Sequence, residues 1–265
     1  MDVIDETSPA EAPRERAGSQ TLLRGLDIIE QLTGEPLRIA EVSDRLELTF
    51  PTTQRLATAL IDRGFLKKLP RGQLALGPKL VQLGFIAREQ IDMLNLARAG
   101  ADALCETIGL CVFIGARDGD VALHLHRAMG RQRIEVATRP GTRRALADTG
   151  LGKALMFDDT PAAWARLFML ARPEQDDGAA AIDEMRAHVA AGVVLHHSTS
   201  DDTIRSVAAP VRDASGAIVA ALSVASPVQY LDDARMREIA PQVLQTVREI
   251  SAGLGWRGAD ARDTA

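Results

Sequence analysis

The stretch that most constrains this chain is residues 37–60, LRIAEVSDRLELTFPTTQRLATAL, which predicts two short helices separated by a tight turn. In its first half, Ile39, Val42 and Leu46 recur on one face of a helical period. The second helix is predicted to begin near Pro51, because proline is favoured at the first helical position. This spacing is typical of a helix-turn-helix, although an ordinary pair of core helices fits the same pattern.

The second predicted helix carries polar side chains on its outer face. Thr49 precedes it as a candidate N-cap, and helical spacing turns Thr53 inward. Thr52, Gln54 and Arg55 are left outside. Uncharged donors and acceptors with one guanidinium are the groups that can read base edges in a major groove.

Residues 65–76, FLKKLPRGQLAL, predict a hairpin, because two short alternating runs flank a Pro-Arg-Gly turn. Helices followed by such a hairpin form a winged helix-turn-helix. From Arg55 to Lys79 there are six basic residues and one acidic residue, Asp62, although the whole chain has a net charge of −5. This local positive charge suits phosphates, the alternative being a solvated charged loop.

Length and composition fit a two-domain protein of 265 residues, with 46% hydrophobic residues for its cores. Cys105 and Cys111 have neither a disulfide-framework pattern nor zinc-site spacing. No apolar run approaches the length of about 18 residues that spans a bilayer, and the N-terminus lacks a signal-peptide core. We therefore expect a cytoplasmic protein without a membrane partner.

The second half predicts an α+β domain, one sheet with helices to one side. Residues 111–130 are expected to form two strands around an Asp-Gly-Asp turn, and residues 131–138 a third. Further strands are expected at 205–212 and 217–225. Helices are expected over residues 146–157, 161–170, 179–191 and 232–254.

Between the two halves, residues 79–108 predict one long helix that begins as a linker and pairs with its copy in a dimer. The alternative is a single buried helix of the second domain. The expected organisation is a disordered arm (1–18), a winged helix-turn-helix (19–78), a linker helix (79–95), an effector-binding and oligomerisation domain (96–256) and a frayed tail (257–265).

Two motifs suggest small-ligand chemistry. Residues 149–154, TGLGKA, fail the Walker pattern because Ala147 and Ala154 occupy required positions, but a glycine-rich loop before a helix can still bind a carboxylate. His124 and His126, two apart on a strand, are expected to share a face. With His196, His197 and Asp201 or Asp202 they are either metal ligands or ordinary histidines; ligand spacing is lacking, and we predict no metal and no catalytic residues.

Five segments, in this order along the chain, carry a resemblance to a known family: SQTLLRGLDIIEQL, EVSDRLELTFPTTQRLATALIDRGFL, LALGPKLVQLG, ADTGLGKALM and SVAAPVRDASGAIVAALSVASP. Over residues 19–254 the chain resembles the IclR family of transcriptional regulators. The resemblance implies a winged helix-turn-helix domain joined to a mixed α/β, GAF-like effector-binding domain. It also implies a homodimer or homotetramer on a palindromic double-stranded DNA operator, a small organic acid or aromatic effector, and no cofactor.

The resemblance also implies the effector contacts. These are the backbone at Gly150 and Leu151, with Ser206 and Ser223. His196 stands where some acid sensors of the family tend to have an aspartate. We hypothesise that His196 and Ser206 recognise a carboxylate or hydroxyl of a small metabolite.

The predicted DNA surface includes one departure from the family, Arg38, which replaces the usual small capping residue and either weakens the helix start or contacts a phosphate. Two rival interpretations stay open, an enzyme with an accessory helical domain and a protein-interaction adaptor. The residues expected to contact DNA are Arg38, Pro51, Thr52, Thr53, Gln54, Arg55, Lys67, Lys68 and Arg71.

Overall fold

The computed structural model describes residues 17–90, 92–134, 136–174, 178–198 and 203–258. The predicted disordered arm and frayed tail therefore lie almost entirely outside the described residues. The chain divides into two compact units, the first of which ends at Gln90. Among the described helices, none combines the length and hydrophobicity needed to cross a membrane.

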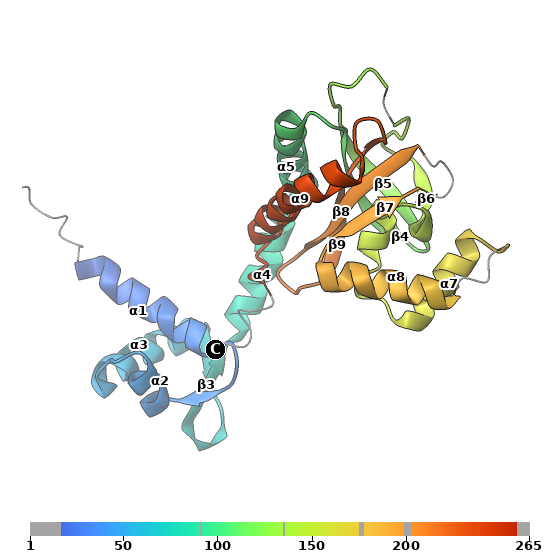
Figure 1. Ribbon diagram of the computed structural model, residues 1–265. Coiled ribbons are helices and arrows are strands. Elements are labelled where there is room, and N and C mark those ends of the chain that lie inside the picture. Colours follow the sequence, from blue (N-terminus) through green and yellow to red (C-terminus); the bar gives the residue numbers. More distant parts are fainter. Residues whose placement is uncertain (1–16, 91, 135, 175–177, 199–202, 259–265) are drawn as a thin grey trace, which may run out of the picture. The chain divides into compact units, whose positions relative to one another are not determined.

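The first unit is the predicted winged helix-turn-helix (Figure 1). Its three helices enclose a small core that includes Ile28, Val42, Ala57 and Leu74, all fully buried. The wing closes a three-stranded antiparallel sheet in the order β1-β3-β2. The elements are α1 (Ala17–Gln31), β1 (Leu37–Arg38), α2 (Ile39–Arg45), α3 (Phe50–Asp62), β2 (Leu66–Lys68), η1 (Pro70–Gly72) and β3 (Gln73–Leu76).

The starts of α2 and α3 differ in detail from expectation. A guanidinium has no acceptor, so Arg38 cannot cap α2 through its side chain. Instead the Glu41 carboxylate accepts a hydrogen bond from the Arg38 backbone N–H at 2.6 Å, which supports the helix start. Thr49 is the N-cap of α3, but its hydroxyl pairs with that of Thr52 at 2.9 Å and not with a backbone amide.

The single helix predicted over residues 79–108, and with it a linker helix over 79–95, is wrong. Helix α4 (Pro78–Gln90) ends and α5 (Met93–Ile108) begins anew. The Asp92 carboxylate accepts a hydrogen bond from the Asn95 backbone N–H at 3.0 Å and so caps α5. A carboxylate that bonds a nearby amide favours a new helix start over a continuous helix.

The second unit is built on a six-stranded sheet in the order β6-β5-β4-β9-β8-β7, with every neighbouring pair antiparallel. The described residues of 131–138 form no strand, contrary to prediction; the short β6 pairs with β5 instead. The strands are β4 (Val112–Asp118), β5 (Val121–Ala128), β6 (Arg143–Ala145), β7 (Val194–His197), β8 (Ile204–Arg212) and β9 (Ile218–Pro227).

Helices cover both faces of this sheet, so the prediction of helices to one side is wrong. Helices α5 and α9 (Asp233–Gly253) pack on one face, and η2 (Leu146–Asp148), α6 (Gly150–Leu155), α7 (Pro161–Ala171) and α8 (Gly178–Ala191) on the other (Figure 1). The consecutive residues Val207, Ala208 and Ala209 in β8 are all fully buried. A continuous apolar run indicates a strand buried on both faces, whereas alternation would indicate one solvated face.

Candidate functional site

Helix α3 and the wing present basic side chains to solvent. Within the part of the chain that the structure describes, Arg55, Lys67, Lys68 and Arg71 have no ion pair and no side-chain hydrogen bond. Their charges are therefore free to meet phosphates. Of the predicted DNA-contacting residues, Thr52 is half-buried, and the exposed ones are Arg38, Pro51, Gln54, Arg55, Lys67, Lys68 and Arg71.

Thr53 is the exception in the predicted DNA surface. Its side chain is 0% exposed, and its hydroxyl donates a hydrogen bond to the Thr49 carbonyl at 3.3 Å. A side chain in this position belongs to the core of the unit and cannot reach a base. We therefore remove Thr53 from the predicted set.

The second unit contains a cavity of about 850 Å³. It lies against one face of the sheet, between the start of α6 and the segment that joins β5 to β6. Such a volume is typical of small-molecule sites. All five predicted effector residues line it: Gly150, Leu151, His196, Ser206 and Ser223.

At the start of α6, the backbone approaches β8 closely. A Cβ on Gly150 would lie 2.4 Å from the Ser206 Oγ and 3.1 Å from the His196 Cβ, so a side chain here would displace the Ser206 hydroxyl and crowd His196. Ser206 and Ser223 are 5% and 3% exposed, and neither hydroxyl has a protein partner among the described residues. These two hydroxyls are available to a ligand in the cavity.

His196 is held by the protein on both ring nitrogens. Its Nδ1 lies 3.0 Å from the Lys153 Nζ, and its Nε2 lies 3.2 Å from the Asp148 carbonyl oxygen. An ammonium only donates, so Nδ1 accepts and Nε2–H donates to Asp148. Burial, aided by the Lys153 charge, lowers the pKa of His196 to about 3. The neutral ring has no free N–H for a ligand. His196 therefore has no donor with which to bind a carboxylate itself, contrary to the hypothesis.

Lys153 lies behind the cavity and was not predicted to have a role. It is 2% exposed, forms an ion pair with Glu184 on α8, and lies over the Phe168 ring. Burial lowers the pKa of Lys153. Burial alone would raise the pKa of Glu184, but the hydrogen bond from His188 and the charge of Lys153 lower it to about 2. Sequence reasoning saw Lys153 only within the failed Walker pattern, because its partner is 31 residues away.

His124 and His126 lie on opposite faces of the sheet, contrary to prediction. The pairing of β5 with β4 shifts between Ile114 and Gly115, so one residue of β5 is bulged and the alternation reverses. His126 pairs with Asp102 of α5 at 2.9 Å, whereas His124 lines the cavity. Burial, with a smaller contribution from Arg144, lowers the pKa of His124 to about 4.

The metal interpretation of the histidines finds no support in the described residues, which contain no group of three or more His, Cys, Asp or Glu placed to hold an ion. His197 pairs with Asp233 at 2.9 Å on the surface. Asp201 and Asp202, the other candidate ligands, lie outside the described residues.

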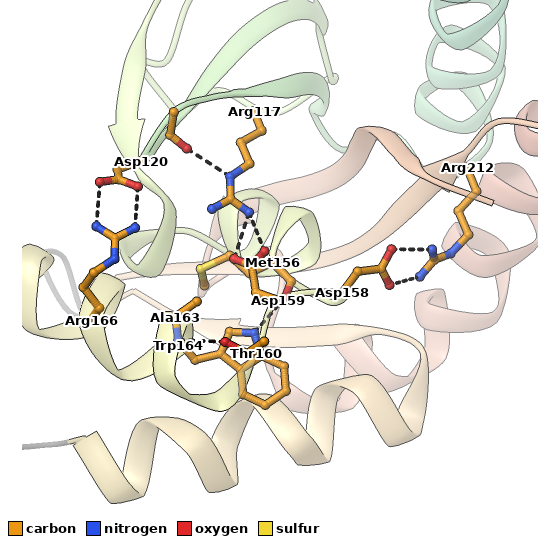
Figure 2. A network of polar contacts seen from close by, with 11 residues as sticks. Arg117, Asp120, Met156, Asp158, Asp159, Thr160, Ala163, Trp164, Arg166 and Arg212 are labelled. Carbon is orange, nitrogen blue, oxygen red and sulfur yellow. Dashed lines mark hydrogen bonds and ion pairs between the residues drawn. The ribbon is translucent and has the colours of Figure 1, made fainter. Parts of the chain in front are cut away.

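Three arginines of the second unit are paired with aspartates in one network (Figure 2). Arg117 binds Asp159, Arg166 binds Asp120 and Arg212 binds Asp158, with shortest N···O distances of 2.8, 2.7 and 2.7 Å. Arg166 and Arg212 each donate through two nitrogens to both carboxylate oxygens, the strong bidentate geometry. The pairs of Arg117 and Arg212 join the ends of β4 and β8 to the segment between α6 and α7, and Arg166 joins α7 to the turn between β4 and β5.

Two family profiles match this chain. Residues 21–70 match the IclR helix-turn-helix domain, and residues 86–252 match the C-terminal domain of the bacterial transcriptional regulator IclR. The second match alone covers more than half of the chain.

Named relatives and solved structures agree with these matches. The HTH-type transcriptional regulator BhcR of Paracoccus denitrificans is 29% identical over 262 residues, spanning 92% of this chain and 94% of BhcR. The regulator XynR of Escherichia coli is 25% identical and spans 89% and 98%. The structure of HmgR from Pseudomonas aeruginosa superposes with a TM-score of 0.77 at 21% sequence identity, covering 91% of this chain and 100% of HmgR. A putative IclR regulator from Silicibacter superposes with a TM-score of 0.78 at 19% identity, covering 91% of this chain and 98% of that one. The structural likenesses show the fold, and the named relatives are regulators, not enzymes.

Proposed function

Because this chain belongs to the IclR family of bacterial transcriptional regulators, we propose that it binds a palindromic operator as a homodimer or homotetramer and senses a small organic acid or aromatic metabolite. The observation that carries the proposal is that one chain has unpaired basic side chains on a winged helix and also a cavity lined by two free hydroxyls. The first supplies DNA affinity, and the second supplies a site at which a ligand changes it.

On DNA, the first turn of α3 enters the major groove, where Gln54 and Arg55 read base edges with Thr52 beside them. Lys67, Lys68 and the wing tip contact phosphates, which position the protein without specifying a sequence. In a dimer, two such helices enter successive major grooves about 34 Å apart or a multiple of it. Arg38, exposed at the start of α2, is a further phosphate contact.

Helix α4 supports assembly of two copies. Its apolar side chains Val81, Leu83, Phe85 and Ile86 are exposed, Phe85 to 64%. Large exposed apolar side chains gathered on one helix mark interaction sites. We propose that α4 pairs with the same helix of a second copy, as the linker prediction expected.

The protein is expected to exchange between a conformation that binds DNA and one that does not. Effector binding regulates DNA binding only if the ligand binds one of these two conformations more tightly than the other. We propose that the ligand's acidic or polar group binds the Ser206 and Ser223 hydroxyls and the backbone at Gly150 and Leu151. His196 acts as a positioning residue, because Lys153 and Asp148 already occupy its nitrogens.

The DNA part is tested by fluorescence anisotropy on the upstream region of the protein's own operon and on a scrambled duplex. Arg55→Ala should relax the preference for the operator, whereas Lys67→Ala should weaken both duplexes alike. Equal losses on both duplexes for Arg55→Ala would remove Arg55 from base recognition.

The effector part is tested by a thermal-shift screen of organic and aromatic acids. A compound that stabilises the wild-type protein and releases the operator should do neither with Gly150→Ala, whose methyl group would meet the Ser206 Oγ. Gly178→Ala, in the same unit, is the matched control, because a Cβ there meets only the Ala165 Cβ, at an ordinary contact distance of 3.8 Å. If Gly150→Ala responds like wild type, the effector binds elsewhere.

A further inference from the structure

His124 is a buried polar side chain in the cavity wall that has no partner. It is 6% exposed, and within the described chain neither ring nitrogen has a hydrogen bond. Buried polar groups in folded proteins are nearly always satisfied, because an unpaired one destabilises the fold. An orphaned imidazole beside a ligand-sized cavity therefore requires an explanation.

The groups around His124 on the protein side are apolar, already bonded, or, like Arg144 of the cavity lining, close enough to act through charge without a hydrogen bond to the ring. Opposite it on β4 stands Gly115, which has no side chain, and the Phe113 ring meets the imidazole edge-on at 5.7 Å between centroids. Its backbone N–H and C=O are bonded to Thr142 and Gly141. The cavity that His124 lines is the remaining source of a partner, and because each ring nitrogen has less than 1 Å² of exposed surface, the ring must turn about its Cβ–Cγ bond to present one.

The free hydroxyls lie across the sheet from His124. In the strand order, β5 is two strands from β9, which carries Ser223, and three from β8, which carries Ser206. Neighbouring strands are about 4.8 Å apart, so these backbones are separated by roughly 10 and 14 Å along the sheet. A ligand that contacts both ends must be elongated, and a cavity of about 850 Å³ accommodates one.

We propose that His124 binds a hydroxyl group of the effector at the end opposite to the group held by Ser206 and Ser223, so that the effector is an elongated hydroxy acid. A neutral imidazole has one donor and one acceptor, which a hydroxyl matches by accepting and donating. A carboxylate can only accept and would leave the acceptor nitrogen unmatched. Burial keeps the ring neutral, since the pKa of His124 lies near 4. This inference rests on the proposed function and narrows its ligand.

The binding test uses full-length protein and two matched probe pairs, 4-hydroxybenzoate against benzoate and 6-hydroxyhexanoate against hexanoate, in isothermal titration calorimetry. The wild-type protein should bind the hydroxylated member of at least one pair about 10-fold more tightly. His124→Phe should reduce that ratio to about 1, because the donor and acceptor are gone. His126→Phe, the same change on the same strand but outside the cavity, should retain the preference.

A second measurement needs no ligand. Removing an orphaned polar group should raise the Tm of the ligand-free protein by about 2–4 °C in His124→Phe, or in His124→Leu if phenylalanine is too large. A lower Tm in both variants would mean that the ring already has a stabilising partner, which overturns the proposal.

Two binding outcomes also overturn it: no hydroxylated probe binds the wild-type protein, or the hydroxyl preference survives in His124→Phe. The second outcome is separable from failure of the proposed function. If Ser206→Ala weakens the probes while His124→Phe keeps the preference, the effector site stands and only the role of His124 is lost.

Discussion

The basic side chains of α3 and the wing differ in their partners from several basic side chains of the second unit. On α3 and the wing, Arg55, Lys67 and Lys68 are exposed and, in the described structure, unpaired. In the second unit, Arg117 and Arg212 are paired with aspartates, and even the buried Lys153 has a carboxylate partner. A paired charge has little attraction left for phosphates, so we expect pairing, more than the number of basic residues, to decide which surface binds DNA.

The largest expected effect comes from removing the unpaired charges. In the variant Lys67→Ala, Lys68→Ala, Arg71→Ala, a dimer loses six phosphate contacts, and affinity for any duplex should fall about 1,000-fold at low salt. The slope of log K against log salt should decrease by about five, since each contact contributes about 0.9. Fluorescence anisotropy across a salt series measures both.

The matched control removes three paired arginines: Arg117→Ala, Arg143→Ala, Arg166→Ala. Because these charges are neutralised within the protein, the salt slope should stay unchanged. A similar decrease in slope in both triple variants would mean that pairing does not decide where DNA binds.

The next effect concerns the buried pair. Glu184→Ala leaves the Lys153 ammonium buried without a carboxylate and should lower the free energy of unfolding by about 3–5 kcal/mol. Lys153→Met removes the buried charge itself, and Glu184, partly exposed, is then solvated, so the loss should be much smaller. Urea denaturation measures the free energy of unfolding of both variants. Equal losses would contradict the view that the buried ammonium of Lys153, and not the partly exposed Glu184, is the group that needs its partner.

Acid should destabilise the second unit through its buried neutral histidines. The pKa of His124 is about 4 in the folded protein and near 6.5 when unfolded, so the folded state binds fewer protons between these values. The stability that depends on a neutral His124 is complete above pH 6.5 and is lost as the pH falls towards 4. The loss in the free energy of unfolding from His124 should be roughly 2–3 kcal/mol. Tm measured from pH 7 to pH 4 should fall less steeply in His124→Phe than in His126→Phe. Identical slopes would mean that His124 is not buried in its neutral form.

Sequence reasoning succeeded where the signal is local. The period of Ile39, Val42 and Leu46 and the proline at 51 located the helix-turn-helix within one residue at most boundaries, because a helix is defined by neighbours in the chain. It failed for the second unit's layers and for the bulge that separates His124 from His126, since strand register depends on a partner strand.

The effector residues came from a family resemblance, and their common cavity is a structural finding. Gly150, Ser206 and Ser223 stand far apart in the chain, and no spacing rule joins them. The orphaned state of His124 and the pairing of Lys153 with Glu184 are contacts between distant residues, which periodicity cannot predict.

The smallest expected effect tests the paired side of the contrast alone. Arg117, about one-third exposed, donates to both oxygens of Asp159 and to the Gly119 carbonyl (Figure 2). Arg117→Ala should lower the free energy of unfolding by about 1 kcal/mol, because partly exposed pairs contribute little. In a double-mutant cycle with Asp159→Ala, the coupling energy between the two residues should account for most of that loss. DNA affinity should stay at the wild-type value. If Arg117→Ala instead weakened DNA binding as strongly as Lys67→Ala, an arginine paired with a carboxylate would contribute as much to phosphate binding as an unpaired lysine. The contrast between paired and unpaired basic side chains would then not explain where DNA binds.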